Sequence, residues 1–333
     1  MRLCLITNPG SGSAEQGAVL RDHAAEVGGV VWETQQEGDA AAFVQRAAAE
    51  GFDLVAACGG DGTVNEVVNG LMALDAAARP AFGIVPLGTG NDFARTLALP
   101  TDPLEAMRLL STGARVRLDA FRLTSSRADR YGVNMAAGGF SGLVNEEMDE
   151  DLKKRWGPIA YLIGAAKALP DLEPFRLALY LDAETPEAAP HSVIDAYNVF
   201  VANGRYVAGG KSVAPYADPA DGWLDVVVVR ASNAADMARL AGAFLSDAHH
   251  DDVLLAQFRA RRVVVESTPC MLFNVDGELV AQEPLALDVV PAALDTVVGP
   301  GYVAQERSLP AHSMVQTVFG VDTSTLPGPP GAA

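Results

Sequence analysis

The stretch CGGDGTVNEVVNG, residues 58–70, contains four glycines, three of which lie between an apolar run and an amphipathic segment. The apolar run before it (53–58) predicts a strand, and the segment after it (64–74) predicts a helix. A glycine-rich turn between a strand and a helix lets backbone N–H groups approach an anion closely. Thr63 and Glu66 have the spacing of a capping box, which would fix the start of the helix. A phosphate-binding turn and a tight turn without a ligand both explain a single motif of this kind.

Two further polar turns follow predicted strands and narrow that choice. They are NPGSGS (8–13) and PLGTGND (86–92). The carboxyl ends of strands are where open α/β sheets bind ligands, so three such turns predict a nucleotide site. The chain has neither a G-x-G-x-x-G opening its first helix nor a G-x-x-x-x-G-K-[ST], so the Rossmann and Walker signatures are missing.

Acidic residues lie inside two of these turns. Asp61 belongs to the second turn along the chain and Asp92 to the third. A bare carboxylate repels phosphate, but a carboxylate beside a phosphate is expected where Mg²⁺ lies between them. The combination predicts phosphoryl transfer rather than dinucleotide binding.

The pattern of apolar segments predicts α/β plus all-β architecture. Predicted strands alternate with single helices in the first third, which is typical of a parallel sheet covered on both faces. The predicted strands are 3–7, 30–34, 53–58, 82–86 and 115–121, and the predicted helices are 14–27, 39–49, 64–74, 92–98 and 103–110. The later part is β-rich, with segments at 176–182, 196–204, 223–230, 262–267 and 285–290 and helical patches at 156–169 and 234–247. This texture predicts a β-sandwich.

We therefore predict two domains and a tail. An N-terminal α/β nucleotide-binding domain with a parallel sheet covers 1–122, and a strand after Pro291 is expected to return to it, so that 292–304 would complete it. A C-terminal β-sandwich domain covers 123–291. Residues 305–333, which end in LPGPPGAA, are expected to form a mobile tail.

Composition excludes some classes of partner and compartment. The net charge of −18 over 333 residues argues against nucleic acid, because phosphate backbones bind basic surfaces. The three cysteines, Cys4, Cys58 and Cys270, form no C-x-x-C pair and are expected to be buried in a reducing compartment. No apolar stretch reaches the roughly 18–20 residues of a membrane span. We expect a cytoplasmic protein.

Longer motifs resemble a known family. GGDGTVNEVVNGL (59–71) and PLGTGNDFAR (86–95) closely resemble the two catalytic-domain motifs of the diacylglycerol kinase and sphingosine kinase superfamily, and bacterial soluble lipid kinases are the most similar members. The resemblance continues through Asn134, residues 203–226 and NVDGE (274–278). It implies ATP or GTP bound, with Mg²⁺, in an active-site cleft between the two domains.

The resemblance also implies roles for individual residues. Asp61, Asp92 and Asp119 match acids linked to the catalytic Mg²⁺, Asp276 matches the general base, and Glu278 is a less favoured base. The positions that match nucleotide contacts are Asn8, Ser11, Thr34, Gly59, Gly60, Asp61, Gly62, Thr63, Val64, Asn65, Glu66, Gly88, Thr89 and Asn91.

A structural Mg²⁺ site is implied further along the chain. Asp218, Asp221 and the backbone carbonyl of Trp223 match its ligands, and a solvated acidic turn is the alternative. Lys211 stands where the family usually has a third glycine after Gly209 and Gly210, and either a phosphate contact or a solvent-facing side chain would explain it.

We predict an ATP-dependent lipid kinase that transfers the γ-phosphoryl group to a lipid hydroxyl, with a diacylglycerol-like acceptor. An NAD kinase-type phosphotransferase, a nucleotide-binding regulator without turnover and a phosphofructokinase-like sugar kinase are the alternatives; the β-rich second half weakens the last. Diacylglycerol, phosphatidylglycerol, ceramide and sphingoid bases all stay open as acceptors.

The expected partners are the membrane lipid substrate and, transiently, the membrane surface. Lys153, Lys154, Arg155 and Trp156 form the most basic run of the chain, and they are expected to contact anionic lipid unless they are only a solvated helix start. The sequence is compatible with a homodimer.

Overall fold

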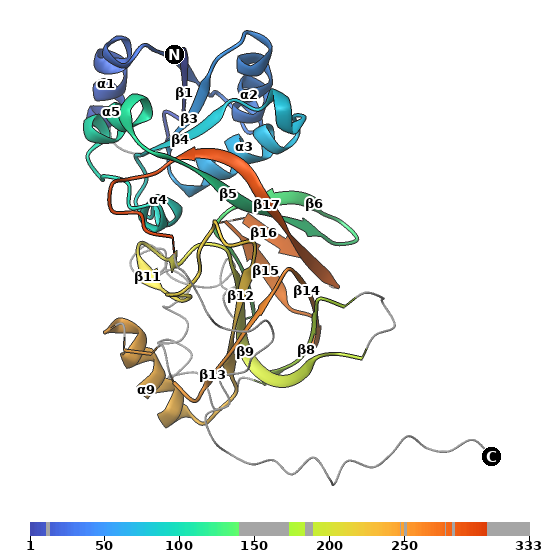
Figure 1. Ribbon diagram of the computed structural model, residues 1–333. Helices are drawn as coiled ribbons and strands as arrows, with labels where there is room; N and C mark the ends of the chain where they lie inside the picture. Colours follow the sequence, from blue (N-terminus) through green and yellow to red (C-terminus); the bar gives the residue numbers. More distant parts are fainter. Residues whose placement is uncertain are drawn as a thin grey trace, which may run out of the picture.

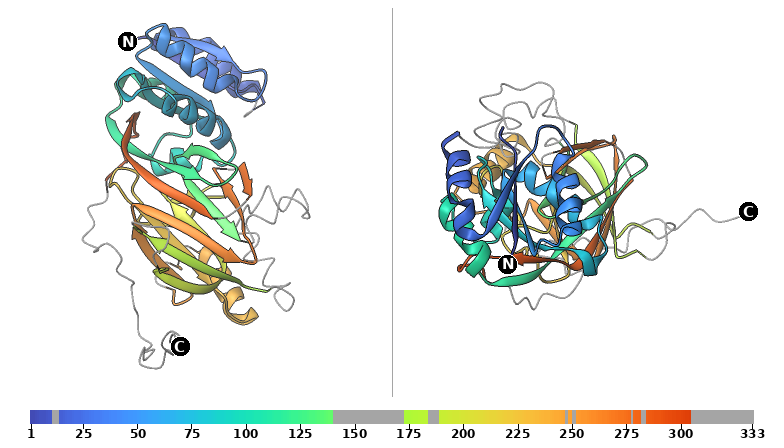
Figure 2. Two further views of the ribbon diagram at one scale, coloured as in Figure 1. Left: turned by 90° about the vertical axis from the view of Figure 1, so that its right-hand side faces the viewer. Right: turned by 90° about the horizontal axis from the view of Figure 1, so that it is seen from above.

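A computed structural model describes residues 1–10, 14–139, 173–183, 189–246, 248–249, 252–276, 278–281 and 284–304. The predicted helix at 156–169, the basic run at 153–156 and the tail from 305 lie outside these residues. The described part forms two domains, one above the other in Figure 1 and in the left view of Figure 2. Among these residues, no helix is long and apolar enough to cross a membrane.

The upper domain contains the predicted parallel sheet. Its four strands are β1 (Leu3–Thr7), β2 (Gly29–Glu33), β3 (Leu54–Gly59) and β4 (Ala81–Pro86). They pair in parallel in the order β2-β1-β3-β4. Every residue of β1, β3 and β4 is buried, as expected for strands covered on both faces. The ends of β1, β3 and β4 are therefore neighbours at one edge.

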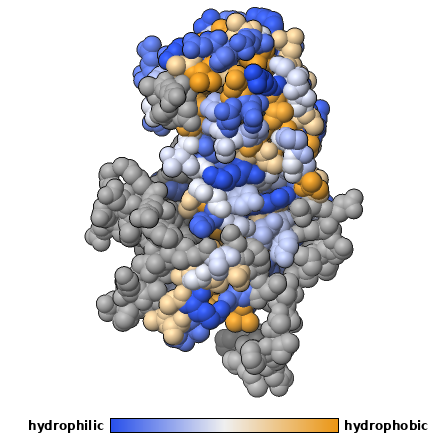
Figure 3. Space-filling view, turned by 90° about the vertical axis from the view of Figure 1, so that its left-hand side faces the viewer, coloured by the Kyte–Doolittle hydropathy of each residue, from blue (hydrophilic) through white to orange (hydrophobic). Residues whose placement is uncertain are grey.

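Helices cover both faces of this sheet (Figure 1). They are α1 (Ala14–His23), η1 (Ala24–Val27), α2 (Asp39–Ala49), α3 (Asp61–Met72), η2 (Ala76–Ala78), α4 (Asp92–Thr96) and α5 (Pro103–Thr112). Buried residues of α2, α3 and α4 share one apolar core, and those of α5 and η1 share another. On the face in Figure 3, hydrophilic and hydrophobic residues are interspersed over this domain.

Helix α3 begins two residues before Thr63, so the predicted capping box is wrong. The N-cap is Gly60 in an extended conformation, and it makes no side-chain capping hydrogen bond. Because the first N–H groups of a helix have no partner within the helix, this start leaves amides facing the edge of the sheet. An anion could bind there.

The lower domain is the predicted β-sandwich (Figure 2). Its strands are β5 (Arg115–Thr124), β6 (Asp129–Gly132), β7 (Met135–Gly139), β8 (Phe175–Leu181), β9 (Ser192–Ala202), β12 (Leu224–Arg230), β13 (Leu255–Ala260), β14 (Arg262–Thr268), β15 (Leu272–Val275), β16 (Glu278–Ala281) and β17 (Leu285–Val297). A short hairpin of β10 (Tyr206–Val207) and β11 (Lys211–Ser212) and the helix α9 (Ala234–Leu245) complete it. Alternate residues of β9 and β12 face two different cores, one inside the sandwich and one beneath α9.

Strand β17 connects the two domains. It pairs antiparallel with β14 and β5 and, at Thr296, parallel with Phe82 of β4. The expected break at Pro291 does not occur, because the register shifts there and Ala292 takes a positive φ of 51°. A bulge tolerates proline, which has no N–H for a strand ladder. One strand therefore serves both sheets.

Asp119 on β5 fastens this bulge. Its carboxylate accepts the N–H of Ala292 at 2.7 Å and the N–H of Gly222 at 2.7 Å. The side chain is 2% exposed, and burial raises its pKa. Asp119 thus ties β17 and the turn before β12 to β5.

Of the cysteines, Cys4 and Cys58 are buried as expected, whereas Cys270 is exposed.

We predict that Asp119→Asn lowers the free energy of unfolding by about 1–3 kcal/mol, because an amide NH₂ then faces a buried backbone N–H. Urea unfolding followed by circular dichroism measures the change. The control is Asp129→Asn. Asp129 forms an exposed ion pair with Arg122, and exposed pairs contribute little, so this variant should unfold at nearly the same urea concentration as the wild type. A fully stable Asp119→Asn that loses only activity would contradict this structural role.

Candidate active site

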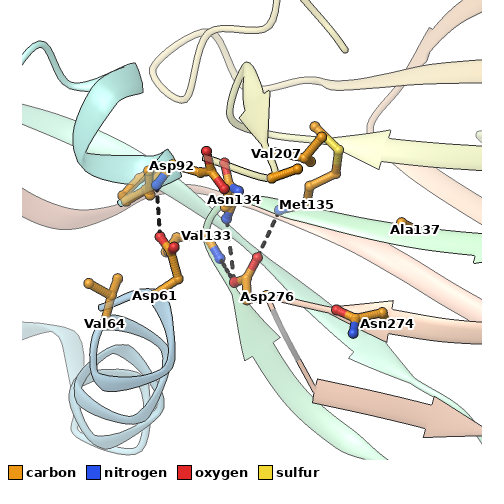
Figure 4. A pocket seen from close by; sticks show the side chains of 12 residues that line it. Asp61, Val64, Asp92, Val133, Asn134, Met135, Ala137, Val207, Asn274 and Asp276 are labelled. Atoms are coloured by element: carbon orange, nitrogen blue, oxygen red, sulfur yellow. Dashed lines mark hydrogen bonds between the residues drawn. The ribbon is translucent and has the colours of Figure 1, made fainter. Parts of the chain in front are cut away.

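A cavity of about 200 Å³ opens between the two domains, at the edge where the glycine turns meet (Figure 4). Side chains from both domains line it. The upper domain contributes Asp61, Val64, Asp92 and Phe93, and the lower domain contributes Val133, Asn134, Met135, Ala137, Val207, Ala208, Asn274 and Asp276. Three of the predicted catalytic acids, Asp61, Asp92 and Asp276, are thus brought together.

Two glycine turns are packed backbone to backbone beside this cavity. A Cβ on Gly88 would lie 2.5 Å from the Cα of Gly60, so no larger residue fits at position 88 without movement. Asn91, at a positive φ of 53°, closes the third turn by accepting the N–H of Gly88 and donating to its carbonyl. The side chain of Asn91 therefore fixes the conformation of this turn, and the backbone of the turn lies next to the start of α3.

Asp61 and Asp92 are the first residues of α3 and α4, and they face each other. The N–H of Asp92 donates to Oδ1 of Asp61 at 3.0 Å. Burial and the charge of Asp92 raise the pKa of Asp61 to about 6, and burial raises the pKa of Asp92 as well. The two carboxylates are therefore electrostatically unfavourable as they stand, which suits a site for a cation.

The lower domain holds Asp92 through a backbone nest. Consecutive residues 208–210 all have positive φ, and the N–H groups of Gly209 and Gly210 donate to the carboxylate at 3.2 and 2.7 Å. Such concave arrangements of amides bind anions. Lys211, just after the nest, starts β11. The contact joins Asp92 of the upper domain to the β-sandwich.

Asp276 lies on the turn between β15 and β16, at a positive φ of 47°. Its Oδ1 accepts the N–H of Met135 at 2.8 Å, and its Oδ2 accepts the N–H groups of Val133 at 2.9 Å and Asn134 at 3.4 Å. Burial raises its pKa, and these hydrogen bonds act in the opposite direction. The carboxylate is fixed against the cavity, as Figure 4 shows.

Asn65 of α3 also reaches Asp276. Its Nδ2 donates to Oδ2 of Asp276 at 3.2 Å, and only 1% of the residue is exposed. The sequence placed Asn65 among the nucleotide contacts, but its described side-chain contacts are with Asp276, Asn69, Arg130 and Tyr131. Asn69 and Arg130 were not anticipated. The NEVVNG spacing, which puts Asn65 and Asn69 one helical turn apart, is a sequence signal for Asn69, whereas no motif points to Arg130.

The remaining predicted nucleotide residues lie along the same edge. Thr34 is buried after β2 and donates to the carbonyl of Thr7, while Thr89 is exposed in the third turn. Asn8 is exposed and accepts the N–H of Gly10. The nucleotide contacts of these residues stay predictions. Ser11 and the side chain of Glu278 lie outside what the structure describes.

Asp119, Asp218, Asp221 and Trp223 form a separate cluster that does not line the cavity. Oδ1 of Asp218 accepts the hydroxyl of Tyr302 at 2.7 Å, and Asp221 pairs with Arg259. Burial raises the pKa of Asp221 to about 7, although Arg259 opposes this. The guanidinium of Arg259 supplies a positive charge beside Asp221, where the predicted structural Mg²⁺ would bring one. The structural Mg²⁺ site stays a prediction. Within the described ranges, no group of three or more His, Cys, Asp and Glu residues could hold a metal.

Comparison with known proteins matches two successive segments of the chain. The family model for the diacylglycerol kinase catalytic domain matches residues 2–123. The model for the YegS C-terminal NAD kinase beta sandwich-like domain matches residues 134–298. The cavity therefore lies where residues from the two matched segments meet.

Curated relatives and solved structures extend over most of the chain. A probable lipid kinase YegS-like protein of Xanthomonas oryzae pv. oryzae (strain MAFF 311018) is 34% identical over 80% of this chain and 84% of its own. A diacylglycerol kinase of Staphylococcus saprophyticus subsp. saprophyticus is 32% identical over 74% of this chain and 76% of its own.

Two crystal structures from Bacillus anthracis str. Sterne share the fold. One aligns with a TM-score of 0.77 at 26% identity, covering 91% of this chain and 96% of that chain. The other, a diacylglycerol kinase, aligns with a TM-score of 0.73 at 24% identity, over 91% of this chain and 98% of its own. The chain belongs to the family of YegS-like lipid kinases and diacylglycerol kinases.

Proposed function

We propose that this protein transfers the γ-phosphoryl group of ATP to the hydroxyl of a diacylglycerol-like lipid, with Mg²⁺. The observation that carries the proposal is the convergence of Asp61, Asp92 and Asp276 on one cavity between the domains. Family membership supports the kinase chemistry. The apolar side chains Phe93, Met135 and Val207 beside these acids support a lipid acceptor.

Each part of the site has a role in this reaction. The amides at the start of α3 and in the adjoining turns bind the triphosphate. Asp276 accepts the proton of the lipid hydroxyl while the oxygen of that hydroxyl forms a bond to the γ-phosphorus. The bond from that phosphorus to the β,γ-bridging oxygen breaks, and ADP leaves. Holding the reactants in line supplies most of the rate enhancement in such transfers.

Asp61 and Asp92 are the residues that would hold Mg²⁺. Two adjacent carboxylates whose pKa values are raised gain from a bound cation, and Mg²⁺ typically uses one or two carboxylates together with phosphate oxygens. When bound, the ion neutralises charge on the phosphates. The residues present therefore fit the ion that the family implies.

The proposal is tested by incubating the purified protein with labelled ATP, Mg²⁺ and either a panel of lipids or NAD. We expect label in a diacylglycerol-like lipid. Labelling of NAD alone would replace the proposal with an NAD kinase. Tight nucleotide binding without labelling of any acceptor would indicate a regulator.

We also propose that residues 153–156 contact the membrane. Sedimentation of the protein with phosphatidylserine vesicles measures this binding.

We predict that Asp276→Asn lowers kcat for lipid phosphorylation by about 10²–10⁴-fold, because an amide cannot accept the proton. The affinity for the nucleotide should stay unchanged, since the expected phosphate contacts lie on the upper domain. Steady-state kinetics and calorimetric nucleotide titration measure the two quantities. Full activity of the variant would rule out Asp276 as the base.

We predict that Asp61→Asn stabilises the metal-free protein at pH 7 while it weakens binding of Mg-nucleotide. A pKa of about 6 for the folded state, against about 4 for an ordinary aspartate, means that the folded protein binds the proton more tightly. The wild type therefore loses stability as pH rises from about 4 to about 6, and the variant lacks this loss.

The melting temperatures of the wild type and of Asp61→Asn, measured without metal across the pH range, report this difference in stability. Asp129→Asn, which removes an exposed ion pair, is the control. A melting temperature of Asp61→Asn below that of the wild type at neutral pH would contradict the prediction. So would an unchanged affinity for Mg-nucleotide.

A further inference from the structure

The side chain of Asn65 joins a chain of polar groups that ends on Asp276. Its Oδ1 accepts Nη2 of Arg130 at 3.0 Å and Nδ2 of Asn69 at 3.1 Å. Its Nδ2 donates to Oδ2 of Asp276 at 3.2 Å and to the carbonyl of Tyr131 at 3.4 Å. Helix α3 thus contacts β6 and the turn after β15 through one buried amide.

The orientation of this amide follows from its neighbours. An arginine guanidinium only donates hydrogen bonds, so the Asn65 atom that faces Arg130 is the oxygen. The nitrogen must then face Asp276, where it meets an acceptor. Asn69 is fixed in the same way, because its Oδ1 accepts the N–H of Tyr131 at 2.9 Å and its Nδ2 donates to the carbonyl of the same residue at 2.9 Å.

The hydrogen bonds to Asp276 are unequal between its two oxygens. In the described part of the chain, Oδ2 accepts three hydrogen bonds, from Val133, Asn134 and Asn65. Oδ1 accepts one hydrogen bond, from Met135. Gly132 packs against the same side, since a Cβ there would lie 3.0 Å from Oδ2. A proton therefore has room at Oδ1 and not at Oδ2.

We propose that Asn65 is a positioning residue for phosphoryl transfer: it holds Oδ2 of Asp276 and leaves Oδ1 to receive the proton of the acceptor hydroxyl. This inference rests on the proposed function of Asp276. Asn65 donates a hydrogen bond that favours the carboxylate, and Arg130 and Asn69 keep its amide turned the right way. Among the described residues, Arg130 and Tyr131 of β6 and, across the cavity, Asp61 and Asp92 are titratable or charged groups near Asp276.

The test is the Asn65→Asp variant, because an aspartate side chain has the same shape as that of asparagine. The introduced carboxylate still accepts from Arg130 and Asn69, but an anionic oxygen now faces Oδ2 of Asp276 in place of a donor. We expect the acid limb of the kcat–pH profile to move up by about one unit or more, because a like charge raises the pKa of a carboxyl. Since one unit is a factor of ten in protonation, kcat should fall about tenfold at pH values below the limb and recover at high pH.

The profile is measured from about pH 5 to about pH 9 at saturating ATP, Mg²⁺ and diacylglycerol in mixed micelles. KM for ATP should stay within about twofold of the wild type, as expected for an interaction that acts in the chemical step. An unshifted acid limb with a raised KM for ATP would overturn the inference and assign Asn65 to the nucleotide. Asn65→Leu, which removes the donor without adding a charge, must show a shift in the same direction and decides the matter if Asn65→Asp does not fold.

Asn233→Asp is the control. It makes the same chemical change at the N-cap of α9, where Oδ1 accepts the N–H of Asp236, and this position does not line the cavity. We expect an unmoved acid limb. An equal shift in this control would mean that an added negative charge acts from anywhere on the protein, which overturns the specific role of Asn65.

Asp276→Asn, assayed in parallel, separates this inference from the proposed function. If Asp276→Asn is inactive and Asn65→Asp leaves the acid limb unmoved, only the role of Asn65 fails. If Asp276→Asn stays active, the assignment of Asp276 as the base fails, and the inference about Asn65 fails with it.

Discussion

Buried carboxylates held by N–H donors at the domain boundary and beside it are the constraint on which this structure depends. Asp92 of the upper domain accepts the amides of Gly209 and Gly210, and Asp119 accepts those of Gly222 and Ala292. Asp276 of the lower domain accepts the side-chain amide of Asn65. A buried carboxylate without such donors is costly, so the contacts of Asp92 and Asp276 favour one relative position of the domains. The contacts of Asp119 fasten the lower domain internally.

The same contacts explain how the site can be both rigid and reactive. Backbone donors fix the carboxylates without neutralising them, while burial keeps the pKa of Asp61, Asp92 and Asp276 above the ordinary value. Asp61 and Asp92 repel each other until a cation is present. Asp276, which stands apart from that pair, remains available for a proton. One cavity therefore contains acids suited to two different tasks, as expected when environment rather than residue type sets the role.

The two domains contribute in different ways to this arrangement. In the upper domain, adjacent parallel strands bring three turns to one edge, and tight glycine packing exposes backbone amides there. In the lower domain, β17 extends the sandwich into the first sheet and carries a bulge that Asp119 fastens. A single strand shared by both sheets connects the domain with the glycine turns to the domain that supplies Asp276. Reaction geometry is then a property of the pair of domains.

The sequence alone determined the alternation of strands and helices, the glycine turns and the acids that we propose for the site. These depend on local periodicity and on short motifs, which are readable within about a dozen residues. Tertiary structure decided what the polar side chains contact. It separated Asp119 from the cavity, started α3 at Asp61 and carried β17 through Pro291. It also joined Asn65 to Asp276, 211 residues away. Partners so distant in the chain are fixed by packing, because no local pattern records which donor will meet a buried carboxylate.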